Sequence, residues 1–161
     1  MALKQIWAPW RMKYILNEEA GGCVFCEYLN QKTVQEPVLH ISDHSFVVMN
    51  TFPYNSGHIL VVSKKHVKYP EELSKEEYFD LCELVRVSAG VLTKQLQADG
   101  INVGLNIGKA AGAGMEHLHY HLVPRWVGDT NFMPIVGETK VIAEHITATY
   151  EKLLPGFSSG G

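Results

Sequence analysis

Three histidines alternate with apolar or aromatic residues over residues 117–121, in the run His-Leu-His-Tyr-His. In a β-strand, successive side chains point to opposite faces of the sheet, so residues two positions apart share a face. The run therefore predicts a strand with three imidazoles on one face, roughly 6–7 Å apart between neighbouring Cα atoms. The intervening Leu118, Tyr120 and Leu122 are expected to face the core.

A glycine-rich segment, residues 108–114, comes just before these histidines. Glycine-rich loops expose backbone N–H groups, and such groups bind anions. An anion site beside three convergent imidazoles predicts phosphate chemistry. The residues also leave two alternatives open. The histidines could have no function, or they could bind a metal, since imidazoles two apart on strands ligate zinc.

The rest of the chain indicates an α+β domain. Apolar, β-branched runs predict strands at residues 38–41, 45–49, 58–62 and 102–106, and the histidine run predicts another at 117–126. A capping box of Ser74 and Glu77, followed by apolar residues at helical spacing, predicts a long helix over 74–98. Gly100 is expected to end that helix, and a second helix is predicted over 139–153. The hairpin-like order of the strands favours an antiparallel sheet with helices on one side.

Length and composition allow a single domain with its own core: the chain has 161 residues, of which 46% are hydrophobic. We expect an N-terminal extension at 1–22, a domain at 23–154 and a flexible tail at 155–161. The extension lacks the compact apolar run of a secretory signal, and no stretch reaches the roughly 20 apolar residues that span a bilayer. These features favour a cytoplasmic protein without a membrane partner.

The formal net charge of −3 argues against a nucleic-acid polymer as partner, because proteins that bind one usually carry a basic face. A small nucleotide is not excluded, since a few well-placed donors hold a phosphate without any excess of positive charge over the whole molecule.

Cys23 and Cys26 form a Cys-x-x-Cys pair, which serves either metal binding or redox chemistry. No thioredoxin-like βαβ pattern surrounds the pair, so the sequence favours metal. A closed zinc site needs about four ligands, and His66 and His44 are both candidates. Two reduced cysteines in a loop are the alternative. Cys82 lies in the apolar pattern of the long helix and is expected in the core.

Residues 117–123, His-Leu-His-Tyr-His-Leu-Val, match the signature of the histidine-triad (HIT) family of nucleotide hydrolases and transferases, and the chain resembles that family over about 23–125. Residues 50–62 look like the family's ribose-binding segment. Residues 123–132, with Trp-Ala-Pro-Trp-Arg at 7–11, resemble a bacterial branch related to fragile-histidine-triad hydrolases and diadenosine tetraphosphate phosphorylases. The resemblance implies a HIT-like fold, with a sheet of about five antiparallel strands, one long helix and a C-terminal helix. It also implies a homodimer in which two sheets join edge to edge.

The resemblance implies catalytic roles for three histidines. His119, the middle histidine of the run, would attack the α-phosphorus of a nucleotide and form a covalent intermediate that water or phosphate resolves. His121 would hydrogen bond to the leaving group or protonate it, and His58 matches a supporting histidine.

Contacts to the nucleotide are implied in the same way. Asn50 would bind the ribose hydroxyls, and Asn106 would contact the phosphate bridge. Backbone N–H groups of Gly112 and Gly114 would bind the phosphate together with His119 and His121. Many relatives carry Gln followed by Ser or Thr where this chain has Ala113 and Gly114. Backbone N–H groups or Lys109 must therefore replace two side-chain donors.

For the metal, the resemblance implies a structural zinc ion held by Cys23, Cys26, His66 and His117. The function that follows is cleavage of dinucleoside polyphosphates, such as diadenosine tetraphosphate, at the α-phosphate. Three alternatives stay open: phosphorolysis instead of hydrolysis, a non-catalytic nucleotide-binding module, and a zinc hydrolase that uses all three histidines of the run.

Overall fold

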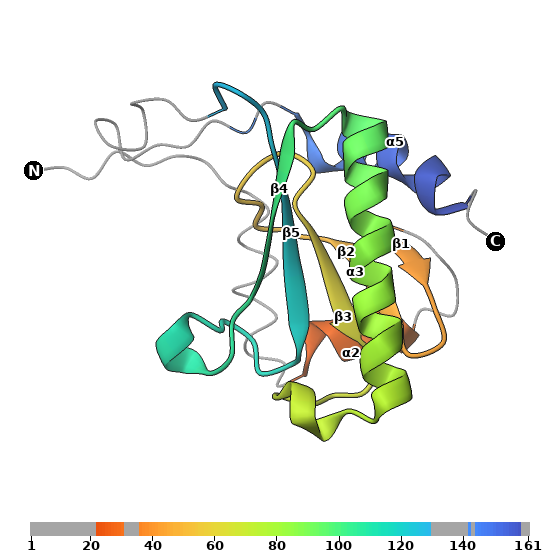
Figure 1. Ribbon diagram of the computed structural model, residues 1–161, viewed down its shortest axis with the longest axis vertical. Helices are drawn as coiled ribbons and strands as arrows, with labels where there is room; N and C mark the ends of the chain where they lie inside the picture. Colours follow the sequence, from red (N-terminus) through yellow and green to blue (C-terminus); the bar gives the residue numbers. More distant parts are fainter. Residues whose placement is uncertain (1–21, 31–35, 130–141, 143, 159–161) are drawn as a thin grey trace, which may run out of the picture.

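The structure is a computed structural model that describes residues 22–30, 36–129, 142 and 144–158 (Figure 1). Within these residues, five strands form one open sheet, in the order β1-β2-β3-β5-β4 with every neighbouring pair antiparallel. The predicted antiparallel sheet is therefore confirmed. The strands are β1 (Val38–Ile41), β2 (Ser45–Met49), β3 (Ile59–Ser63), β4 (Gly100–Leu105) and β5 (His119–Arg125).

Strand β5, which carries His119 and His121, lies inside the sheet, and it begins later than predicted, so that His117 precedes it. On β5, His121 pairs with Leu60 of β3 on one side and with Gly104 of β4 on the other. His119 pairs with Val62 of β3. Because backbone hydrogen bonds hold β5 from two sides, the positions of its side chains are fixed by the sheet.

The helices cover both faces of the sheet. The long α3 (Lys75–Leu96) and α5 (Ile146–Ser158) pack on one face, where Leu118 and Leu122 join their apolar core. The short α2 (Val24–Asn30) packs on the opposite face, where Phe25 contacts the apolar side chain of Phe46. The expectation that all helices lie on one side is therefore wrong for α2.

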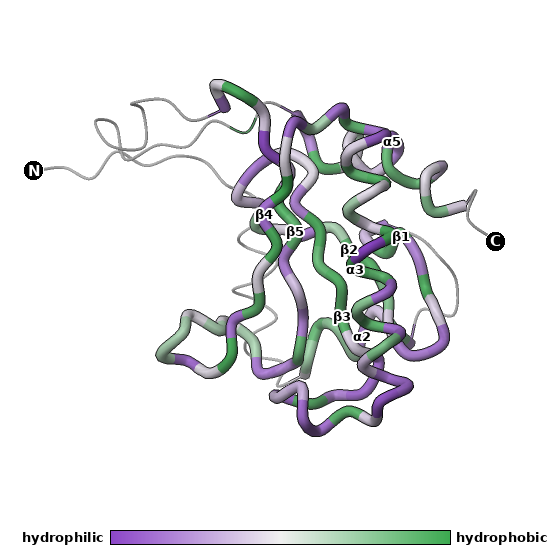
Figure 2. The backbone as a smooth tube through the Cα atoms, in the orientation of Figure 1, coloured by the Kyte–Doolittle hydropathy of each residue, from purple (hydrophilic) through white to green (hydrophobic). Residues whose placement is uncertain are grey.

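The hydropathy of each element agrees with this packing (Figure 2). Strands β2 and β3 are buried along their whole length, as expected for strands covered on both faces. Helix α3 alternates between apolar and polar residues, because one of its faces contacts the sheet and the other contacts solvent.

Helix α3 begins as predicted and ends earlier. The Ser74 hydroxyl accepts from the Glu77 N–H and the Glu77 carboxylate accepts from the Ser74 N–H, which confirms the capping box. At the other end, Gln97 caps the helix with a left-handed φ of 52°. The indole N–H of Trp126 contacts the carbonyls of Leu96 and Gln97, so a distant side chain satisfies the helix end. Gly100 instead opens β4.

The C-terminal helix starts and ends later than predicted. Helix α5 begins at Ile146, whereas the predicted helix began at residue 139. Residues 139–141 and 143 lie outside the described part of the chain. Residues 155–158, expected in a tail, form its last turns because Phe157 is buried in the core. Most of the expected N-terminal extension also lies outside the described part. None of the described helices is long and apolar enough to cross a membrane.

Candidate active site and metal centre

Three of the predicted site histidines lie together at the centre of the sheet. His119 and His121 come from β5, and His58 comes from the residue before β3. The ring centroids of His119 and His121 are 4.9 Å apart, and those of His58 and His121 are 5.2 Å apart. His58 and His119 are buried and His121 is half-buried. The fold therefore forms one continuous row of imidazoles.

The tautomer of His119 follows from one short contact. Its Nδ1 lies 2.6 Å from the carbonyl oxygen of His117. Because a carbonyl oxygen only accepts, Nδ1 carries the proton and donates it, which leaves the lone pair on Nε2. Burial lowers the pKa of His119, and the bond to the carbonyl of His117 partly opposes this effect. A neutral ring with an unprotonated Nε2 is the form that can act as a nucleophile.

A second chain of contacts sets the protons of His58 and His121. The backbone N–H of Tyr54 donates to Nδ1 of His58 at 3.0 Å, so the proton of His58 lies on Nε2. That Nε2–H donates to Nδ1 of His121 at 3.0 Å. The proton of a neutral His121 therefore lies on Nε2. Burial, followed by the charge of His119, lowers the pKa of His121 to about 4.

Asn50, the predicted ribose ligand, lies beside His58. Its side-chain nitrogen is 3.2 Å from Nδ1 and 3.3 Å from Nε2 of that ring. Its side-chain oxygen accepts from the backbone N–H of Phe52 at 2.9 Å. Asn50 is thus oriented by its own turn and borders the histidine row.

The predicted phosphate loop connects β4 to β5. Gly108 and Gly112 adopt φ values of 80° and 86°, a left-handed region that favours glycine, and they flank the short helix η2 (Lys109–Ala111). The Asn106 side chain donates to the carbonyl of Gly112 at 3.3 Å and so closes the loop. Lys109 and Asn106 line a small cavity beside the loop, and Gly114 is exposed.

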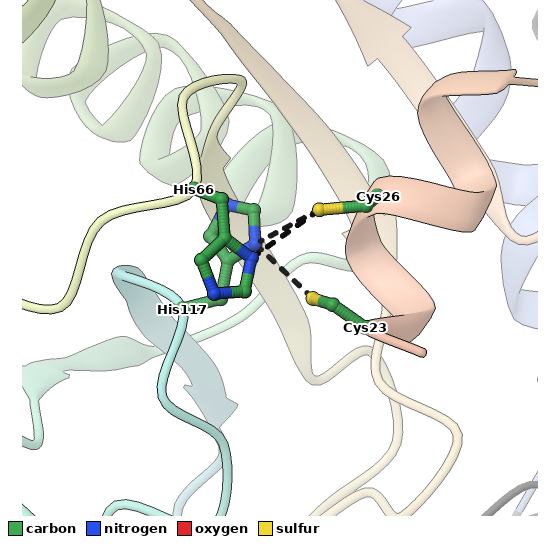
Figure 3. A group of neighbouring side chains, drawn as sticks. All are labelled: Cys23, Cys26, His66 and His117. Atoms are coloured by element: carbon green, nitrogen blue, oxygen red, sulfur yellow. Dashed lines mark hydrogen bonds between the residues drawn. The ribbon is translucent and has the colours of Figure 1, made fainter. Parts of the chain in front are cut away.

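The four predicted metal ligands come together at the other end of the row (Figure 3). The Sγ of Cys23 lies 3.2 Å from Nδ1 of His117, and the Sγ of Cys26 lies 3.3 Å from Nδ1 of His66. All four donor atoms lie within 4.8 Å of one another. Two thiols and two imidazoles are the donor set of a structural zinc site, so these residues fit the metal implied by the resemblance. His44, the alternative ligand, is not in this group, and its backbone N–H donates to the carboxylate of Asp80.

The protonation of the cluster also suits a metal. The Nε2 of His117 lies 2.7 Å from the carbonyl oxygen of Ser63 and donates to it, so Nδ1 presents its lone pair to the cysteines. Burial lowers the pKa of His117 to about 4, which keeps the ring neutral, as a ligand must be. Burial and the neighbouring Cys23 raise the pKa of the Cys26 thiol, an effect that a bound cation would reverse.

Only His117 of the run belongs to the metal group within the described part of the chain. This arrangement gives no support to a zinc hydrolase that uses all three histidines. Cys82, expected in the core, is half-buried on α3 and is not part of the group.

Two aromatic residues of the site were not predicted. The Phe25 ring lies 5.2 Å from His119 and 5.5 Å from His117, and its position between the two cysteines could have indicated this. The Tyr54 ring lies 4.7 Å from His58 and 5.8 Å from His121. The resemblance of residues 50–62 to a ribose-binding segment covers Tyr54, but the contact of its ring with two histidines depends on how the loop between β2 and β3 folds.

A model of the HIT domain family matches residues 31–127. The chain belongs to the HIT domain family. It is 34% identical to an AP-4-A phosphorylase of Mycobacterium tuberculosis over 157 residues, which covers 91% of this chain and 80% of that protein. It is also 34% identical to a bis(5'-adenosyl)-triphosphatase of Dictyostelium discoideum over 91 residues, or 56% of this chain and 61% of that protein.

Solved structures agree with the HIT fold. A Zn-bound histidine triad family protein from Mycobacterium smegmatis gives a TM-score of 0.71 at 23% identity, covering 86% of this chain and 94% of that one. A hypothetical histidine triad nucleotide-binding protein from Sulfolobus tokodaii gives 0.70 at 24% identity, covering 85% and 93%. These likenesses confirm the predicted fold.

Proposed function

We propose that this HIT protein cleaves dinucleoside polyphosphates, such as diadenosine tetraphosphate, at the α-phosphate through a covalent nucleotidyl-His119. The observation that carries the proposal is the bond from Nδ1 of His119 to the carbonyl of His117, because it leaves the Nε2 lone pair for attack. The substrate class is supported by the names of the Mycobacterium tuberculosis and Dictyostelium discoideum relatives.

In the first step, Nε2 of His119 forms a bond to the α-phosphorus and the bond from that phosphorus to the leaving polyphosphate oxygen breaks. The Nε2–H of His121 donates to the departing oxygen and stabilises its negative charge. Backbone N–H groups of Gly112 and Gly114 would bind the non-bridging oxygens. Asn106 would contact the phosphate bridge, and Asn50 would bind the ribose.

In the second step, an acceptor oxygen attacks the phosphorus and releases His119. Water gives AMP and ATP from diadenosine tetraphosphate, whereas phosphate gives ADP and ATP. Phosphate is the second candidate for two reasons. The Mycobacterium tuberculosis relative that aligns with 91% of this chain is called a phosphorylase. Ala113 and Gly114 also lack the side-chain donors of many relatives.

For the cluster of Cys23, Cys26, His66 and His117, we propose a structural zinc ion. An ion held there would join the α2 region, the segment after β3 and the residues just before β5, three segments far apart in sequence. Its chemistry would be structural, because four protein ligands close a tetrahedral site and leave no position for substrate.

We also propose that the protein is a cytoplasmic homodimer. Strand β4 is an edge of the sheet that pairs on one side with β5, and Val103 on it and Ile107 beyond it are exposed apolar residues. An exposed edge is a ready surface for a second copy. All three cysteines are free, in keeping with a reducing compartment. Sedimentation equilibrium of the wild type and of Val103→Lys tests the dimer: a monomeric wild type contradicts it.

A rapid-quench experiment tests the catalytic proposal. Diadenosine tetraphosphate labelled with 32P at the α-phosphate is mixed with enzyme and denatured without acid. We expect acid-labile label on the wild type and none on His119→Ala, with metal content and circular dichroism unchanged. His44→Ala, an exposed histidine outside the row, is the matched control and should label normally. Wild-type protein that binds the nucleotide and never carries label is a binding module and not an enzyme.

A further inference from the structure

We propose that Tyr54 is a positioning residue for His121. The aromatic ring of Tyr54 holds the His121 imidazole in the plane needed to reach the leaving group. This inference rests on the proposed function. Tyr54 lies in the segment between β2 and β3, where the resemblance gives the ribose contact to Asn50 and no role to Tyr54.

Tyr54 contacts the histidine pair with both its backbone and its side chain. Its N–H donates to Nδ1 of His58, the bond that places the proton of His58 toward His121. Its ring lies 4.7 Å from His58 at 43°, and 5.8 Å from His121 at 16°, close to parallel. Tyr54 therefore sets the tautomers of His58 and His121 through its backbone N–H, and its ring also lies beside the ring of His121.

The segment that carries Tyr54 is anchored to the sheet, so the ring has a defined place. The side chain of the next residue, Asn55, donates to the carbonyl of Pro124 at 3.1 Å and to the carboxylate of Asp129 at 2.8 Å. The carbonyl of Asn55 accepts from the N–H of His58 at 3.2 Å. A ring attached to a fixed turn can restrain its neighbour, whereas a ring on a loose loop could not.

His121 needs such a restraint. The hydrogen bond from His58 reaches only Nδ1 of His121, so it breaks when the His121 side chain turns to another rotamer. A nearly parallel aromatic ring favours one orientation, because aromatic pairs prefer offset stacking. Tyr54 is 54% exposed, whereas His58 is fully buried, so Tyr54 contacts the pair from the solvent side. Displacing a catalytic group by about 1 Å can lower turnover about 100-fold.

Two variants separate the ring from the rest of the residue. Tyr54→Ala removes the ring and keeps the backbone donor to His58, while Tyr54→Phe keeps the ring and removes the hydroxyl. Phe79→Ala, which removes a 73% exposed aromatic ring on α3, is the control for a surface truncation. All variants are first compared with wild type by thermal melting to show that they fold.

Turnover of diadenosine tetraphosphate and 15N spectra of the histidine rings give two readouts. For Tyr54→Ala we expect kcat to fall about 10- to 100-fold while KM changes less than about threefold, and Tyr54→Phe to stay within about twofold of wild type. In the spectra, His58 should keep its Nε2–H tautomer in Tyr54→Ala, whereas the His121 signals should shift toward an average of both tautomers.

Two kinetic results would overturn the inference: an unchanged kcat in Tyr54→Ala, with or without a change in KM, and a Tyr54→Phe variant as slow as Tyr54→Ala. A change in KM alone indicates that the ring binds substrate, and a slow Tyr54→Phe indicates that the hydroxyl acts. The spectra need no turnover. An inactive wild type therefore contradicts the proposed function, while unchanged His121 signals in Tyr54→Ala contradict this inference alone.

Discussion

The carbonyl oxygen of His117 accepts a hydrogen bond from Nδ1 of His119 at 2.6 Å, so a residue of the metal centre also orients the proposed nucleophile. His117 presents Nδ1 to the two cysteines and donates from Nε2 to the carbonyl of Ser63. Its ring and its carbonyl therefore belong to two different sites. A change at the metal centre is expected to reach His119 through this one residue.

Removal of the metal should lower both stability and turnover. Without the ion, α2 and the residues just before β5 lose their common ligand site, and the His117 carbonyl is less well fixed. Zinc returned at about 100 times its Kd should raise the free energy of unfolding by about 2.7 kcal/mol. Metal analysis and urea unfolding before and after chelation measure this effect. Cys26→Ser should lose the metal, while Cys82→Ser, outside the cluster, should keep it; equal stability with and without chelator contradicts the prediction.

His58 and His121 should act as a unit in catalysis. Replacing either with Ala breaks the bond between Nε2 of His58 and Nδ1 of His121, so each single variant should lose about 100- to 10,000-fold in kcat. The double variant should be about as slow as the worse single one, because residues that act together give non-additive losses. Losses that multiply in the double variant would show that the two rings act independently.

The activity should persist below the usual pKa of histidine. Burial lowers the pKa of His119, and attack needs its neutral ring. Protonation of His119 should therefore remove activity only at a pH below the usual histidine pKa of about 6.5. The value of kcat/KM is therefore expected to be level near pH 8 and to fall on the acid side with a midpoint below pH 6.5. As the pH falls, His121 takes up a proton in the unfolded chain before it does so in the folded protein, because its folded pKa is lowered to about 4. The free energy of unfolding therefore falls between about pH 6.5 and 4, and circular dichroism at each pH is the control for unfolding. An acid limb centred at 6.5 or above contradicts the expectation.

Much of the site could be predicted because its residues follow local patterns. The spacing of two in residues 117–121 fixes which side chains share a face, and the Cys-x-x-Cys pair indicates a ligand set. The end of α3 could not be predicted, because the Trp126 indole that satisfies it comes from a turn about 30 residues away in sequence. The side on which α2 packs and the place of Tyr54 depend in the same way on contacts between distant segments. The local pattern predicted that the C-terminal helix ends at residue 153, whereas α5 continues to Ser158 because Phe157 is buried in the core.

Two glycine substitutions should have opposite effects on stability. Gly57 adopts a φ of 77°, and an added Cβ would lie 2.4 Å from Leu96 and 3.0 Å from Pro124. Gly57→Ala should therefore lower the free energy of unfolding by about 1–2 kcal/mol and reduce kcat, because His58 is the next residue. Gly90 lies inside α3 with open space around it, so Gly90→Ala should raise the free energy of unfolding by about 0.5–1 kcal/mol. Urea unfolding of both variants checks the signs; a stabilised Gly57→Ala would show that the turn can change its backbone conformation.

The acceptor of the second step should be phosphate when phosphate is present. A nucleotidyl-His119 is resolved by whichever oxygen reaches the phosphorus. A phosphate dianion would be held by the same backbone donors and by the ammonium group of Lys109 in the loop. Diadenosine tetraphosphate and 32P-phosphate should therefore give ATP together with ADP that carries the label in its β-phosphate. Without phosphate, slower formation of AMP and ATP is expected, since water must take the same position. Lys109→Ala should shift the products toward AMP, whereas Lys94→Ala, an exposed lysine on α3, should leave their ratio unchanged. Unlabelled AMP as the sole second product at saturating phosphate would show that the protein is a hydrolase.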